Sequence, residues 1–337
     1  MTSQMKQIFI ISGVVLSVLT ATAAPLKRAD VTADPALLLH VDFDGLRATS
    51  IGKAILEQLN QPEVDTKLAA IKGIFSFDPR TELHGATLYT KMENPQDGVL
   101  IVYADFDSNR VLNLGMLAPG FHAITNGSHV MYSWLDEKEK DKRDRNSNSD
   151  HNPNPHIYAA IQGNRVILGK AEDPVASALA VLDGTEPSLT SGKGVPELKE
   201  AGEGTFIQAM VRKFDFGNKD PNAAIFKMSK QGRLEVGETG GHIVATLGLE
   251  AKDSDTATQI SAIGQGLLAL LKLQQSNPDA LKLANAVAVH QDGNTVTASI
   301  SIASQEAADM IKAKVAEGEH KQHGHKNEKY EKPEKED

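Results

Sequence analysis

The sequence predicts an α+β protein built from two related halves, each an antiparallel sheet with helices packed on one face. Short segments of alternating apolar residues are joined by glycine-containing turns, which is typical of antiparallel hairpins. Segments with apolar residues at helical spacing separate these hairpins. The same order then occurs twice: strand, helix, two strands, helix, hairpin, helix. We therefore expect halves at 36–182 and 205–316, related by an internal duplication and joined by a Gly-, Pro-, Ser- and Thr-rich linker at 183–204.

The first half contains the expected unit and two additions, an extra hairpin and an insertion. Its expected strands cover 36–42, 82–91 and 99–106, its helices 51–59, 64–74, 107–117 and 174–182, and its hairpins 121–134 and 156–170. The two hairpins are predicted to turn at Asn126-Gly127 and Gly163-Asn164. The insertion at 136–155 consists mainly of charged residues, Asn, Ser and Pro, and is predicted to be disordered.

The second half shows the unit most clearly, in residues 253–314. Its expected elements are a strand at 205–214, a helix at 221–230, strands at 233–236 and 242–250, a helix at 256–273, a hairpin at 286–302 and a helix at 305–315. One helix face is expected to carry Ile260, Ile263, Leu267, Leu270 and Leu271. The Asp292-Gly293 pair predicts a type I′ turn, which places the hairpin's valines and isoleucines on one face.

Composition excludes several classes of protein. Of 337 residues, 40% are hydrophobic, which suffices for a core, but only 5% are aromatic, so that core is expected to be aliphatic. A formal net charge of -9 argues against a nucleic-acid partner. The chain has no cysteine, which excludes disulfides and thiolate chemistry.

The first residues predict secretion. Lys6 precedes an apolar run at 8–19, and Ala21-Thr22-Ala23 follows it, which together are typical of a signal peptide at 1–23 that is cut after Ala23. The alternative is an uncleaved anchor. No later segment has the roughly 20 apolar residues that a spanning helix requires. We therefore expect a periplasmic or extracellular protein with no membrane span in the mature chain.

Motifs for familiar enzymes are absent. Gly192-Lys193-Gly194 lacks the remaining residues of a phosphate-binding loop, and no G-x-S-x-G or H-E-x-x-H motif occurs. The favoured function is therefore a non-catalytic binding or scaffolding protein of the cell envelope, with no cofactor and with a ligand or protein partner that the sequence does not identify.

Two Asp-Phe-Asp motifs carry the alternative chemistry. Asp42 and Asp44, and likewise Asp105 and Asp107, lie two residues apart, so each pair shares one face of a strand end. If the two strands are neighbours, four carboxylates converge on a divalent metal such as Ca²⁺ or Mg²⁺, and a hydrolase site becomes the alternative function. The simpler interpretation is that Asp44 and Asp107 cap the helices that follow them.

The C-terminal residues 317–337 form a tail of Lys, Glu and His that is predicted to be disordered. His320, His323 and His325 are close enough in this tail for weak binding of Zn²⁺, Ni²⁺ or Cu²⁺. Metal binding in the envelope through the tail is therefore a further alternative, beside the simpler interpretation of a solvated charged tail.

The segment Leu37-Leu-Leu-His-Val-Asp42, with Leu46-Arg-Ala-Thr-Ser50 and Gly52-Lys53, resembles the opening of uncharacterised secreted bacterial proteins with a domain of unknown function. In those proteins, a strand leads into a similar helix. The resemblance covers about twenty residues. It implies a bacterial envelope setting and no particular activity.

Overall fold

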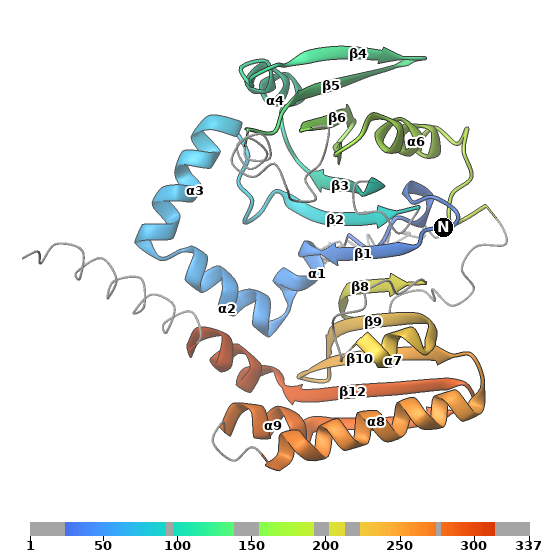
Figure 1. Ribbon diagram of the computed structural model, residues 1–337. Helices are drawn as coiled ribbons and strands as arrows, with labels where there is room; N and C mark the ends of the chain where they lie inside the picture. Colours follow the sequence, from blue (N-terminus) through green and yellow to red (C-terminus); the bar gives the residue numbers. More distant parts are fainter. Residues whose placement is uncertain are drawn as a thin grey trace, which may run out of the picture.

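The computed structural model describes residues 24–91, 97–137, 155–191, 202–212, 223–273 and 278–313. The predicted α+β class is confirmed, because helices pack against a 12-stranded sheet in which the paired strands are antiparallel (Figure 1). The predicted signal peptide, the core of the insertion at 138–154, part of the linker and the tail from 314 onwards lie outside the described residues.

The sheet takes strands from both halves. The first half contributes β1 (Leu37–Asp42), β2 (Leu83–Thr90), β3 (Val99–Ala104), β4 (His122–Asn126), β5 (His129–Leu135), β6 (His156–Gln162) and β7 (Arg165–Gly169). The second half contributes β8 (Thr205–Val211), β9 (Ser229–Thr239), β10 (His242–Ala251), β11 (Val287–Asp292) and β12 (Thr295–Ala303).

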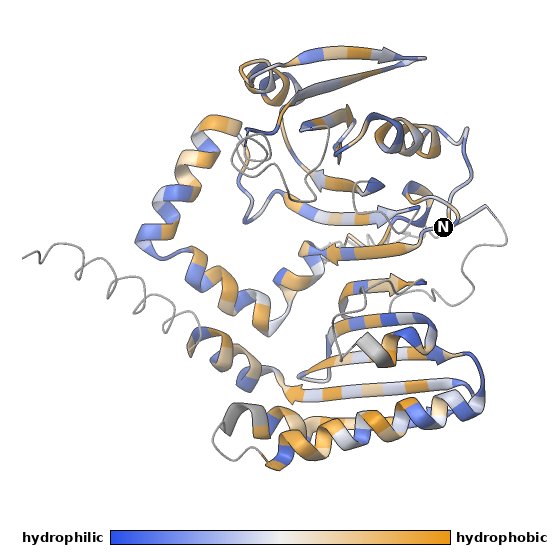
Figure 2. Ribbon diagram, viewed as in Figure 1, coloured by the Kyte–Doolittle hydropathy of each residue, from blue (hydrophilic) through white to orange (hydrophobic). Residues whose placement is uncertain are grey.

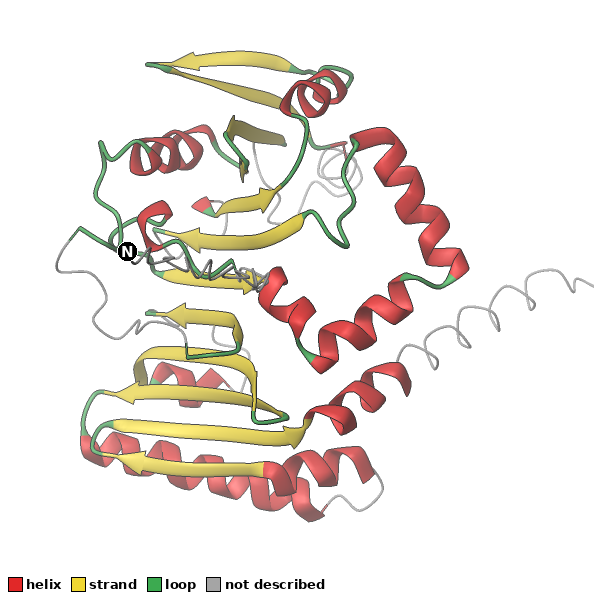
Figure 3. Cartoon of the chain, turned by 180° about the vertical axis from the view of Figure 1, so that it is seen from behind, coloured by secondary structure: helices red, strands yellow, loops and turns green. Residues whose placement is uncertain are grey.

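Helices connect and flank these strands. They are η1 (Arg28–Asp30), α1 (Phe43–Ala48), α2 (Ser50–Leu59), α3 (Pro62–Phe75), α4 (Ser108–Gly115), α6 (Glu172–Leu182), α7 (Ala223–Lys227), α8 (Ser254–Leu273), α9 (Pro278–Ala286) and a helix over residues 304–313. The helices α1, α2 and α3 leave the end of β1 as an arm beside the sheet (Figures 1 and 3).

The two halves form one continuous sheet, with the order β11-β12-β10-β9-β8-β1-β2-β3-β7-β6-β5-β4. Counted outward from the β1–β8 contact, one half runs β1-β2-β3-β7-β6 and the other runs β8-β9-β10-β12-β11. Both halves therefore place their strands in the same order, and the extra hairpin β4–β5 extends the first half beyond β6. The sequence duplication itself stays a prediction.

Three two-residue hairpin turns have the same arrangement. The glycine takes the first turn position, so the two-residue turns are Gly127-Ser128, Gly163-Asn164 and Gly293-Asn294. The prediction was right for Gly163 and wrong for the other two, where the preceding Asn126 and Asp292 belong to the strands. Gly293 has a φ of 54° and Asn294 has no positive φ, which is the pattern of a type II′ turn, not type I′. The error shifts the pairing by two residues, so the predicted faces are retained.

One further prediction was wrong in its boundaries, and one helix was not predicted. The expected helix at 221–230 is shorter, because α7 ends at Lys227 and β9 already begins at Ser229. This strand pairs with both β8 and β10, and pairing on two sides outweighs the local helical pattern. An additional helix, α1, also follows β1 directly.

Each half has its own apolar core. Leu38, Ile101 and Ile167 pack with Val175 and Leu179 of α6 in the first half. In the second half, α8 contributes to the core, which comprises Leu249, Ala251, Ala257, Ile260 and Val296. Both cores are mainly aliphatic, as the composition predicted, with Tyr89 and Tyr103 as the aromatic members of the first.

The two cores lie on opposite faces of the continuous sheet. Directly paired residues share a face, and the pairs Leu38–Met210, Met210–Arg233 and Arg233–Gly248 lead from the first half to the second. Leu249, next to Gly248, therefore points to the other face, and it belongs to the core that contains α8. The helix α6 thus covers one face of the sheet, and α8 covers the opposite one.

The predicted apolar face of α8 is buried only in part. Ile260 is 2% exposed, whereas Ile263, Leu267, Leu270 and Leu271 are 40–61% exposed. The buried residues of α8 lie in its N-terminal half, and most of its other large apolar side chains face solvent. Figure 2 shows these apolar residues continuing towards the C-terminal end of the helix.

Candidate functional site

The four carboxylates of the Asp-Phe-Asp motifs do not converge. Asp107 caps α4, because its Oδ1 accepts from the backbone N–H groups of Asn109 and Arg110 at 2.9 and 3.1 Å. The prediction of a capping role was therefore correct for Asp107. It was wrong for Asp44, because α1 begins at Phe43 and is capped by Asp42, whose Oδ1 accepts from Gly45 N at 2.7 Å.

Asp44 and Asp105 instead meet at His84, which the sequence did not single out. His84 Nδ1 lies 3.0 Å from Asp44 Oδ2, and Nε2 lies 3.0 Å from Asp105 Oδ2. Arg47 also pairs with Asp44. Burial alone would lower the pKa of His84, but hydrogen bonds and charges from Asp105 and Asp44 outweigh that effect and raise it.

This cluster suits an ion pair better than a metal centre. Both ring nitrogens of His84 already face carboxylates, on opposite edges of the ring. Among the described residues, no group of three His, Asp or Glu side chains is placed to hold a metal ion. His320, His323 and His325 lie outside the described residues, so metal binding by the tail stays a prediction.

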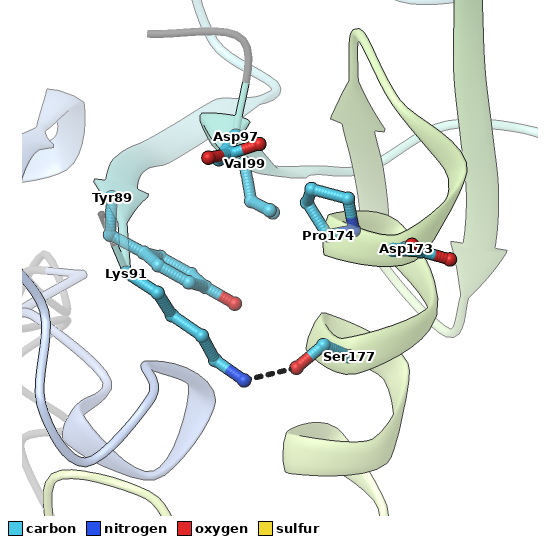
Figure 4. Close-up of a pocket in the computed structure, with 7 residues that line it drawn as sticks. All are labelled: Tyr89, Lys91, Asp97, Val99, Asp173, Pro174 and Ser177. Atoms are coloured by element: carbon cyan, nitrogen blue, oxygen red, sulfur yellow. Dashed lines mark hydrogen bonds between the residues drawn. The ribbon is translucent and has the colours of Figure 1, made fainter. Parts of the chain in front are cut away.

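A pocket of about 250 Å³ opens elsewhere, between the ends of β2 and β3 and the first turns of α6 (Figure 4). Apolar, polar and charged side chains line it. They are Tyr89, Lys91, Asp97, Val99, Asp173, Pro174 and Ser177. Tyr89 comes from the end of β2 and Lys91 directly follows that strand, and α6 supplies the opposite wall.

One side of the pocket is held by a network around Lys91. Its Nζ donates to Glu186 Oε2 at 2.7 Å and to Ser177 Oγ, and Ser177 Oγ donates to the same Glu186 oxygen at 2.6 Å. Hydrogen bonds from Lys91 and then Ser177 hold the pKa of Glu186 below its usual value. The Lys91 charge is thus already neutralised, so this lysine positions the wall and is not a free cation.

Asp97 provides an acceptor that the described protein does not use. Its Oδ2 is buried, and no hydrogen-bond partner for it occurs among the described residues. Tyr89, which lines the same pocket, is 2% exposed, and burial raises the pKa of its phenol. A buried oxygen without a donor is unfavourable, so a ligand with an N–H or O–H group would be stabilised here.

Sequence reasoning missed this pocket. Lys91 and Asp97 are six positions apart, and Ser177 is 80 residues further along the chain than Asp97. No motif links them, because antiparallel pairing and the packing of α6 bring them together. The signal that could have drawn attention was the lysine directly after a strand whose residues are buried or half-buried.

Comparisons with known proteins identify no family. No family model matches the sequence, and no curated protein matches it significantly. Among solved structures, crystal form III of TP0453 is 13% identical, with 87% of this chain and 99% of that chain covered and a TM-score of 0.44. Crystal form I of TP0453 is 10% identical, with 86% and 98% covered and a TM-score of 0.43. At this level of similarity, the likeness assigns neither a function nor a ligand.

No helix in the described part of the chain combines the length and the hydropathy that crossing a membrane requires.

Proposed function

We propose that the protein is a secreted, non-catalytic binding protein of the bacterial cell envelope, and that the pocket between β2, β3 and α6 takes its ligand. The secretion step is supported by Lys6, the apolar run at 8–19 and the Ala21-Thr22-Ala23 site. The resemblance of 37–53 to secreted bacterial proteins supports the same setting.

The buried Oδ2 of Asp97 is the observation that carries the binding function. The pocket also has apolar walls from Val99, Pro174 and the ring of Tyr89. Binding sites commonly combine such walls with a few polar groups that orient the ligand. The volume lies just below the range of about 300–1,000 Å³ that is usual for drug-sized ligands. The ligand is therefore a small molecule with an apolar part and a donor group, such as an amine or a hydroxyl.

Native mass spectrometry of the protein recovered from the envelope fraction tests this proposal. We expect a bound small molecule on the wild-type chain and its loss in Asp97→Asn. The substitution retains the shape of the side chain but removes the charged acceptor, so ligand binding weakens while the fold persists. The released molecule can then be identified and added back in a thermal unfolding measurement, because a ligand that binds only the folded state raises Tm.

Asp255→Asn is a matched control, because this residue lies in α8, outside the pocket. It is expected to retain the bound molecule. Retention of the molecule by Asp97→Asn, or its loss from the control as well, would contradict the assignment to this pocket. A wild-type chain that carries no adduct, and that no small amine or hydroxyl compound stabilises, would contradict binding altogether.

A further inference from the structure

Asp42 is a buried carboxylate whose partners are backbone amides. It is 2% exposed and ends β1, the strand that joins the two halves. Its Oδ1 accepts from Gly45 N at 2.7 Å and from Ala24 N at 3.0 Å. None of the ion pairs between described residues includes Asp42. Burial of a carboxylate without a cation is unfavourable, so a positive charge at one of these two donors would stabilise it.

Ala24 is held at both of its backbone polar groups. Its N–H donates to Asp42, and its carbonyl oxygen lies 3.0 Å from His40 Nε2. The carbonyl has no hydrogen to donate, so Nε2 carries the proton, and Nδ1 accepts from Thr87 Oγ1 at 2.9 Å. His40 is 2% exposed and Thr87 is fully buried. These contacts hold Ala24 in a fixed position against β1, near the centre of the sheet.

Gly85, which pairs with Asp42 across β1 and β2, leaves space for Ala24 because it has no side chain. A Cβ added at Gly85 would lie 3.5 Å from the His40 ring and 3.6 Å from the Ala24 carbonyl oxygen. A larger side chain would therefore compete with Ala24 for its position. The cradle for Ala24 thus consists of His40, Asp42 and Gly85, on two neighbouring strands.

We propose that cleavage after Ala23 converts the Ala24 amide into an α-ammonium group that forms an ion pair with buried Asp42, so that removal of the leader completes the fold. This inference rests on the proposed secretion and its cleavage site. Water hydrolyses the Ala23–Ala24 peptide bond: its oxygen joins the carbonyl carbon of Ala23, which leaves as a carboxylate. The nitrogen of Ala24 takes up the protons and becomes an ammonium group.

The cut changes the chemistry of this contact without moving its atoms. Before cleavage, Ala24 N offers Asp42 one neutral N–H donor at 3.0 Å. After cleavage, the same nitrogen has a full positive charge and three donors, and hydrogen bonds between two charged groups are stronger than neutral ones. The processed chain is therefore more stable than a chain in which a peptide bond precedes Ala24.

Thermal unfolding of two full-length mature chains tests this proposal. One begins at Ala24, and the other has Gly-Ser added before Ala24, which keeps the amide and removes the charge. We expect the Ala24 chain to unfold about 5 °C higher or more, because loss of a cation from a buried pair is strongly destabilising. In Asp42→Asn chains, this difference should disappear, whereas in Asp105→Asn chains, with an exposed carboxylate elsewhere, it should persist.

A second measurement covers the case in which Asp42→Asn does not fold. NMR titration of the Ala24 α-amine in the otherwise unchanged chain should give a pKa above the usual value of about 8, because the carboxylate favours the charged form. An ordinary pKa, or equal Tm values for the two mature chains, would overturn the ion pair.

N-terminal sequencing of the protein recovered from the envelope tests the proposed cleavage by itself, so a failure of the cleavage can be distinguished from a failure of the ion pair. Ala24 as the first residue agrees with both. A chain that begins elsewhere would contradict the proposed cleavage, while the comparison of the two mature chains would still decide whether Asp42 binds an α-ammonium group at Ala24.

Discussion

Glu238 of β9 binds Ser50, the first residue of α2 in the other half, next to the N-cap Thr49. Its Oε2 accepts from Ser50 N at 2.7 Å, and its Oε1 accepts from Ser50 Oγ at 2.8 Å. A carboxylate at a helix N-terminus is favourable, because the first N–H groups of a helix lack partners within it. This contact links residues 188 positions apart and adds to the β1–β8 pairing between the halves.

We expect Glu238→Ala to lower the free energy of unfolding by about 1 kcal/mol, because it removes the hydrogen bonds of a carboxylate at a helix N-terminus while the N-cap Thr49 stays in place. Denaturant unfolding followed by circular dichroism measures this change. Glu235→Ala is the matched control on the same strand, because its carboxylate lies 3.8 Å from Arg233 Nε, too far for a strong hydrogen bond. Equal stabilities of the two variants would show that the contact between Glu238 and Ser50 contributes nothing.

His40 of β1 and His84 of β2 are predicted to have pKa values that are shifted in opposite directions from the usual value of about 6.5. Burial lowers the pKa of His40, and its hydrogen bond to the Ala24 carbonyl offsets only part of this effect. The pKa of His84 is raised, because Asp105 and Asp44 outweigh burial. A ¹H–¹⁵N titration that follows the two imidazoles should show His40 protonating at lower pH than His84, and the reverse order would contradict both assignments.

The effect of His84 on stability follows from the direction of this shift. A histidine whose pKa is higher in the folded than in the unfolded protein stabilises the fold at pH values below its unfolded-state pKa. This stabilisation is lost as pH rises through its folded-state pKa. His84→Gln should therefore lower Tm at about pH 5.5 and have little effect at about pH 8.5. The same loss at both pH values would indicate that His84 acts through packing and not through its charge.

Helix α8 offers a test of which apolar residues form the core. Ile260→Ala should cost about 2–5 kcal/mol, because the residue is 2% exposed. Leu270→Ala should change stability by no more than about 0.5 kcal/mol, because the residue is 61% exposed. Denaturant unfolding of both variants checks this difference, and a large loss for Leu270→Ala would mean that its side chain is covered in solution.

Local patterns predicted the fold class, most strands and the faces of the hairpins, because these depend on alternation between neighbouring residues. They failed where distant segments decide the structure. Ile263 and Leu267 match the helical period of Ile260, yet they are 40% and 43% exposed, because tertiary packing buries only the first part of that face. The meeting of His84 with Asp44 and Asp105 likewise depends on where α1 and the end of β3 lie, which no local spacing encodes.

Two helical glycines are predicted to respond in opposite ways to the same substitution. A Cβ added at Gly52 would lie 1.9 Å from the Leu46 carbonyl oxygen, so Gly52→Ala must open the corner between α1 and α2. We expect a loss of about 3 kcal/mol or more, because a backbone atom cannot move aside as a side chain can. A Cβ added at Gly73 of α3 meets nothing within 4 Å, so Gly73→Ala should stabilise the protein by about 0.5–1 kcal/mol. Thermal and denaturant unfolding of the two variants measure these changes, and equal effects at both positions would contradict the close contact between α1 and α2.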